Sequence, residues 1–207
     1  MKKNKIFIFT VIVLLIISVV SVGLNIKNVA EKDSFRRLLI NNAFSGALEI
    51  SRDLDSLIIA LEDKSEVGAE TRNSLIIISQ EFVRLDTVLK QYAISFPPKG
   101  TIRGSYTGIP DFSYISNSLL AGSDSAGSSM PYNGILVDDA ISGNEIRYLE
   151  ILRDDFKLIA DTMSATDNPL QANGDLTVSQ MDNILKTFFD KWSFNNEECP
   201  YLLLRRE

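Results

Sequence analysis

The chain has 207 residues, of which 45% are hydrophobic and 23% are charged, and this is enough for one domain with a sizeable apolar core. It has no histidine and one cysteine, Cys199, which excludes imidazole-based catalysis, zinc sites that contain histidine, intrachain disulfides and CxxC redox pairs. The formal charge of -6 argues against a nucleic-acid-binding protein, which normally carries a basic face.

The first predicted element is a transmembrane helix over residues 6–24. This stretch carries no charged residue, and at about 1.5 Å per residue it is long enough to cross the apolar core of a bilayer. Three lysines precede it within residues 1–5, so we expect that end in the cytoplasm and the rest of the chain outside it. A cleaved signal peptide is the alternative, because Ser21-Val22-Gly23 offers small residues at cleavage-site spacing. The length of the apolar run favours an uncleaved signal anchor.

A juxtamembrane stalk, residues 25–39, is predicted to connect the anchor to a first helical hairpin, residues 40–96. Apolar residues recur there in alternating steps of three and four, the period of one helix face. The first helix carries the stripe Ile40, Ala43, Ala47, Ile50, Leu54, Leu57 and Leu61. The second carries the stripe Leu75, Ile78, Phe82, Leu85, Leu89, Tyr92 and Phe96. The break between them is short and polar, which predicts antiparallel helices.

Gly46 lies on the first helix between two alanines of the stripe, Ala43 and Ala47. Small side chains there allow a neighbouring helix to approach closely. We favour a crowded position in the protein's own core over a site for a partner helix.

A long connection, residues 97–136, follows the hairpin and is rich in proline, glycine and serine. Asp111 is a predicted N-cap, and apolar residues at helical spacing after it predict a short helix over residues 112–121. The connection also carries aromatic residues, which are typical of recognition surfaces. We therefore name four candidate partner-binding residues, although a plain crossover is the alternative: Tyr106, Phe112, Tyr114 and Tyr132.

Two capping-box patterns mark the helix starts of a second hairpin, residues 137–193. They are Ser142-Gly143-Asn144-Glu145 and Thr177-Val178-Ser179-Gln180. The first precedes the stripe Leu149, Leu152, Phe156, Ile159 and Met163, and the second opens the stripe Val178, Met181, Leu185, Phe188 and Trp192. A C-terminal tail, residues 194–207, contains an apolar run that can dock on the helices or on a partner.

The segment between these two helices, residues 167–175, is predicted to be a loop of turn-forming residues. It looks like a calcium-binding loop, but Ala172 and Val178 stand where that motif requires glycine and glutamate. No segment beyond residue 24 alternates as a strand would. The predicted fold is therefore all-α: an N-terminal transmembrane helix, then a four-helix bundle with a long crossover that contains a short helix.

The sequence offers little for catalysis. Its adjacent carboxylates are Asp138-Asp139, Asp154-Asp155 and Glu197-Glu198, and neighbouring side chains do not converge on a helix, so we interpret them as solvated surface. Neither a phosphate-binding glycine loop nor a GxSxG motif is present. We expect no enzymatic activity, no metal and no cofactor, with a hydrolase that uses carboxylates as a minor alternative.

The function predicted from these features is protein–protein interaction or assembly at the cell envelope. We expect a single-pass cell-membrane protein whose C-terminal domain is extracytoplasmic and binds a protein partner, with a homo-oligomer left open. The alternative is an extracytoplasmic module that binds or senses a small ligand and works through a membrane partner. A buried pocket with convergent polar groups favours the alternative, and a filled core counts against it.

Overall fold

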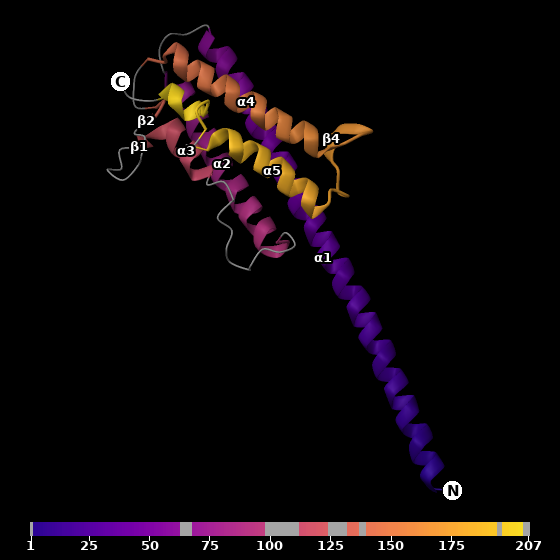
Figure 1. Cartoon of the computed structure of the whole chain (residues 1–207). Helices are drawn as coiled ribbons and strands as arrows, with labels where there is room; N and C mark the ends of the chain where they lie inside the picture. The colour runs from indigo at the N-terminus through magenta and orange to yellow at the C-terminus, as the bar shows by residue number, and fades with distance from the viewer. Residues whose placement is uncertain are drawn as a thin grey trace. The chain divides into compact units, whose positions relative to one another are not determined.

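The computed structural model describes residues 2–62, 68–97, 112–123, 132–136, 140–193 and 196–204. The side chains of residues 1–16 lie outside the described part. The chain divides into two units, Met1–Leu38 and Leu39–Glu207. Most described residues are helical, as the all-α prediction requires (Figure 1). The elements in chain order are α1 (Lys2–Glu62), α2 (Ala69–Ser95), α3 (Phe112–Leu120), β1 (Gly122–Ser123), β2 (Tyr132–Asn133), α4 (Gly143–Met163), β3 (Ser164–Ala165), β4 (Asn168–Ala172), α5 (Val178–Trp192) and the 3₁₀ helix η1 (Pro200–Leu204).

The first unit is helical from Lys2 and forms the N-terminal part of α1. Within the residues that the structure describes, no helix is both long enough and apolar enough to cross a membrane. The predicted transmembrane helix, residues 6–24, falls largely on side chains outside that part. In the predicted stalk, Asp33 accepts hydrogen bonds from Arg36 (2.7 Å) and Arg37 (2.9 Å). These two arginines lower the pKa of the Asp33 carboxyl, Arg37 more than Arg36.

The core of the second unit confirms the predicted helix stripes. All seven residues predicted for the first stripe are buried, and burial on α1 starts at Leu39 and Ile40. Six of the seven predicted for α2 are buried as well, and Phe96 packs against the core partly exposed. The whole predicted stripe of α4 is buried, whereas on α5 Val178 and Leu185 are only half-buried. Helical periodicity thus identified most of the core correctly.

Helices α1 and α2 run antiparallel, as predicted. A Cβ placed on Gly46 would lie 3.4 Å from Cδ1 of Leu85, and Glu49 lies 3.9 Å from Arg84. One hollow between the helices is lined by Asp53–Ala60 at the end of α1 and by Glu70–Ile78 at the start of α2. Gly46 therefore packs against α2 within the protein's own fold, but it is half-buried and a Cβ there would make only ordinary van der Waals contact, so the predicted crowding is not shown.

Helix α3 matches the predicted short helix and packs against α2. The Ser79 and Ser116 hydroxyls lie 2.6 Å apart in the buried contact between the two helices. The predicted N-cap, Asp111, lies outside the described residues. After α3, Gly122 adopts a positive φ of 73°, which glycine tolerates without strain. Strands β1 and β2 pair there as a short antiparallel ribbon, and Gly134 passes so close to the backbone of Ala121 and Gly122 that a Cβ would clash.

Both predicted capping boxes are present. The Glu145 amide donates to Ser142 Oγ (3.2 Å) and the Ser142 amide donates to Glu145 Oε2 (2.6 Å). Thr177 and Gln180 form the same reciprocal pair at the start of α5, with distances of 3.2 Å and 2.8 Å. The sequence pattern therefore located the beginnings of α4 and α5 to the residue.

The prediction of a loop over residues 167–175, between α4 and α5, is wrong. Strands β3 and β4 form an antiparallel hairpin there, with Ser164 opposite Ala172. The hairpin closes onto the end of α4 through a hydrogen bond from the Asn173 amide to the Met163 carbonyl (2.8 Å). Four of the five residues of β4 are exposed and only Ala172 is buried. A strand without a buried face has no apolar alternation, so the period of two that reveals strands is missing from the sequence.

Candidate functional site

The structure describes two of the four predicted partner-binding residues fully. The Phe112 side chain is completely buried, and Tyr114 on the same helix is 46% exposed. Tyr106 and the side chain of Tyr132 lie outside the described residues. The Phe112 ring lies within 5.5–6.3 Å, between centroids, of four other rings: Phe82, Phe156, Phe188 and Phe189. Phe112 is therefore a core residue that joins α3 to α2, α4 and α5, and a partner that approaches α3 meets Tyr114 instead.

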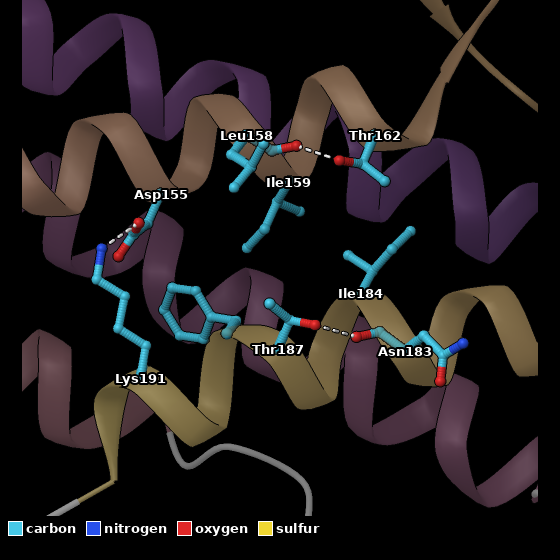
Figure 2. A pocket seen from close by; sticks show the side chains of 9 residues that line it. Asp155, Leu158, Ile159, Thr162, Asn183, Ile184, Thr187 and Lys191 are labelled. Carbon is cyan, nitrogen blue, oxygen red and sulfur yellow. Dashed lines mark hydrogen bonds and ion pairs between the residues drawn. The ribbon is translucent and has the colours of Figure 1, made fainter. Parts of the chain in front are cut away.

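A groove between α4 and α5 is the site that sequence reasoning missed. Its volume is about 280 Å³, and Figure 2 shows the side chains of both helices that border it. Ile159 and Phe188 are buried, Ile184 is half-buried, and Leu158 is 60% exposed at the edge. The lining residues are Asp155, Leu158, Ile159 and Thr162 from α4, and Asn183, Ile184, Thr187, Phe188 and Lys191 from α5.

The two threonines of the groove turn their hydroxyls to their own helices (Figure 2). Thr162 donates to the Leu158 carbonyl (2.7 Å) and Thr187 donates to the Asn183 carbonyl (2.9 Å). A hydroxyl that already donates to a backbone carbonyl offers less to a ligand. The groove therefore favours apolar contact along its length.

One end of the groove carries an ion pair. Asp155 accepts a hydrogen bond from Lys191 Nζ (2.6 Å) and another from Trp192 Nε1 (2.8 Å). The Asp155 side chain is 12% exposed, whereas that of Lys191 is 45% exposed. The carboxylate thus uses both oxygens to tie α4 to α5, and the ammonium group remains accessible to solvent.

The predicted carboxylate pair Asp154-Asp155 does not converge on one point. Asp154 is 62% exposed and pairs with Arg153, while Asp155 turns toward α5. Glu197 and Glu198 are both exposed, and Asp138 and Asp139 lie outside the described residues. Within the described part of the chain, no group of three or more Cys, Asp or Glu side chains could hold a metal ion. The groove, with Asp155 as its one carboxylate, offers binding contacts rather than an acid–base pair.

The residues that line the groove form no recognisable catalytic pattern. No family model, no curated protein and no solved structure matches this chain. The geometry of the described residues therefore carries the functional argument.

Asp155 was placed on the surface by sequence reasoning, and two signals pointed elsewhere. It precedes Phe156, a core residue, and so lies at the edge of the buried stripe of α4. Trp192 closes the stripe of α5, and a buried indole N–H normally needs an acceptor. The two facts together predict a hydrogen-bond acceptor for the Trp192 indole N–H near the end of α5. Sequence alone does not show which carboxylate of α4 faces that N–H group.

Cys199 should be a protected thiol. Its side chain is 2% exposed, and burial raises the pKa of the thiol above its usual range, although a hydrogen bond with the Tyr201 backbone acts in the opposite direction. Because the thiolate is the reactive form, we expect native protein to react with a disulfide reagent at pH 8 about tenfold or more slowly than unfolded protein. Absorbance during thiol titration, with and without denaturant, measures both rates; equal rates would contradict the burial of Cys199.

Proposed function

We propose that the chain is a membrane-anchored, extracytoplasmic four-helix bundle protein that binds a protein partner at the cell envelope. The observation that carries the proposal is the open apolar groove between α4 and α5, which lies beside a filled core. Solvent-accessible apolar grooves are typical binding sites for helices and extended segments of other proteins. No catalytic role is included in the proposal.

The bundle part of the proposal is supported by one continuous core. Residues of α1 from Leu39 onward, α2, α4 and α5 all contribute buried apolar side chains to it. Helix α3 and η1 add Phe112 and Tyr201, whose ring lies 5.3 Å from that of Trp192. Such a core leaves the surface groove as the better-formed place for recognition.

The anchor part of the proposal is supported by the sequence of residues 6–24, which has no charge and follows three lysines. Residues 17–24 of this stretch are exposed on α1, among them Val19 at 70% and Val20 at 54%. Exposed aliphatic side chains on several sides of a helix suit lipid contact better than water. The intact chain should therefore be recovered in the membrane fraction. Protease added to intact spheroplasts should digest its second unit.

A site-specific photocrosslinker tests the groove. A photoreactive phenylalanine analogue at position 158, on the edge of the groove, should capture one protein of defined mass in intact membranes. The matched control carries the analogue at position 157, where Lys157 is exposed on α4 but does not line the groove. Capture at position 158 and none at position 157 supports the proposal, because the neighbouring positions carry the same analogue and only position 158 lines the groove.

Two results would contradict this assignment. Equal capture at positions 157 and 158 would indicate that the captured protein contacts α4 without preferring the side that borders the groove. An adduct at position 158 whose mass fits a small molecule would favour the second candidate, a small-ligand binding module, which the groove volume of about 280 Å³ also suits. Mass spectrometry of the adduct distinguishes a protein from a small ligand.

A further inference from the structure

A row of exposed apolar side chains on the first unit has no partner in the fold described above. Val22, Ile26 and Val29 are 59%, 65% and 61% exposed. They line one shallow hollow on α1 together with Asn25, Ala30 and Asp33, so the six residues share one helix face. Ile26 and Val29 lie beyond the predicted membrane span, where exposed apolar side chains at this spacing are costly in water and indicate a surface that is covered by something else.

The row follows the same seven-residue repeat as the core stripe of α1. Steps of four and three lead from Val22 through Ile26 and Val29 to Asp33 and Arg36, and the next step of four reaches Ile40, the first residue of the predicted stripe. From Ile40 onward the stripe is buried by the chain's own helices. A repeat of 3.5 residues that is maintained through exposed residues is the signature of a coiled-coil contact.

We propose that residues 22–36 of α1 pair with the same residues of a second copy as a parallel two-stranded coiled coil. The parallel direction rests on the proposed function, because two chains anchored in one membrane by the same end run the same way. The apolar positions Val22, Ile26 and Val29 form the contact layers. Asp33 and Arg36 occupy the next two core positions and form two neighbouring charged layers.

Charge complementarity argues for a second copy as the occupant of this face. In parallel coiled coils, each residue at a core position enters a hole formed by four residues of the facing helix. For Asp33 that hole consists of positions 29, 32, 33 and 36 of the second copy, and it places Lys32 and Arg36 of that copy around the carboxylate. The two Asp33 carboxylates in the layer are thus surrounded by cations from both chains, which offsets their mutual repulsion.

Asp33 is already organised for such a layer within one chain. Arg36 and Arg37 both donate to it, and they keep the pKa of its carboxyl below the usual range, so Asp33 is ionised at neutral pH. Charged or polar core positions in a coiled coil fix the register of the two helices at some cost in stability. The apolar row and the charged layer are therefore complementary to the same residues in another copy.

Cysteine crosslinking of the full-length chain in membranes tests the proposal. All variants carry Cys199→Ala, so that each has one cysteine and any disulfide joins two chains. Ile26→Cys and Val29→Cys place the thiol in the proposed contact, whereas Asn28→Cys and Glu31→Cys place it on other faces of the same two turns. A mild oxidant should convert at least about five times more of the first pair than of the second to dimer on a non-reducing gel.

A separate variant tests the charged layer at Asp33. Asp33→Lys in the Ile26→Cys background should lower the dimer fraction severalfold, because it puts cations from both chains into one layer without a carboxylate between them. Crosslinking that is equal at positions 26, 28, 29 and 31, or absent at all four, would overturn the pairing. An unchanged dimer fraction for Asp33→Lys would overturn the assignment of this charged layer.

Membrane fractionation of the same samples separates this inference from the proposed anchor. If the chain is recovered in the soluble fraction and still crosslinks at positions 26 and 29 but not at 28 and 31, the pairing stands and the anchor fails. If the chain is membrane-bound and shows no difference between positions, the anchor stands and the pairing fails.

Discussion

Phe112→Ala should lower the free energy of unfolding by about 3–5 kcal/mol, the usual cost of truncating a buried phenylalanine. The Phe112 ring is fully buried among rings of α2, α4 and α5, so its removal leaves a cavity where three helices meet. Urea titration of the full-length chain in mild detergent measures the effect. Trp192, the one tryptophan of the chain, is buried near this cluster and supplies the fluorescence signal.

Tyr114→Ala is the matched control, because it truncates an aromatic residue of the same helix that is 46% exposed. We expect a change within about 0.5 kcal/mol for this variant, as for most surface substitutions. Similar losses of unfolding free energy for the two variants would show that the buried Phe112 ring does not hold α3 in place. A large loss of unfolding free energy for Tyr114→Ala alone would mean that Tyr114 is the core residue of α3 and Phe112 the exposed one.

Leu85→Asp should abolish the cooperative unfolding transition of the second unit. Leu85 is 3% exposed and packs against Gly46 of α1. An unpaired carboxylate at that point costs on the order of 4–5 kcal/mol or more, which is comparable to the whole stability of an ordinary domain. Circular dichroism and the steepness of the urea transition measure the loss.

Val83→Asp provides the control for Leu85→Asp. It adds the same carboxylate to the same helix two residues away, at a position that is 51% exposed. Net charge changes equally in the two variants, and the difference in helix propensity between Leu and Val is only a few tenths of a kcal/mol, so a difference of several kcal/mol between them reports burial. Retention of the native transition by Leu85→Asp would mean that α2 does not pack its predicted stripe onto α1.

Sequence reasoning worked best where one physical rule dominates. The stripes of α1, α2 and α4 were identified because a helix that buries one face must repeat its apolar residues every three or four positions. The starts of α4 and α5 were identified because Ser142 with Glu145, and Thr177 with Gln180, satisfy exposed backbone amides in a way that few other residues can. In each case the signal is local to the element that it describes.

The candidate site could not be obtained in the same way. Aromatic residues in a connection can face outward or inward, and Phe112 faces inward because its ring packs against Phe82 of α2, Phe156 of α4 and Phe188 of α5, a fact of tertiary packing. The groove likewise depends on the spacing of α4 and α5, which a stripe pattern does not contain. Leu158 fell outside the predicted stripe of α4, as did Ile146 and Ile151, and such exceptions hint at an apolar edge without showing where it lies.

The buried hydroxyls of α3 bear on how many arrangements this chain can adopt. Ser116 pairs with Ser79 of α2, and Ser118 pairs with Tyr148 of α4 at 2.6 Å. If α3 slid by one turn along its neighbours, Ser79 and Tyr148 would lose these two bonds, at about 1–3 kcal/mol for each hydroxyl left unsatisfied. Apolar contacts alone tolerate such a shift far better. The two serines therefore fix the position of α3 along α2 and α4. A single set of sharp side-chain resonances is expected for α3 in NMR spectra.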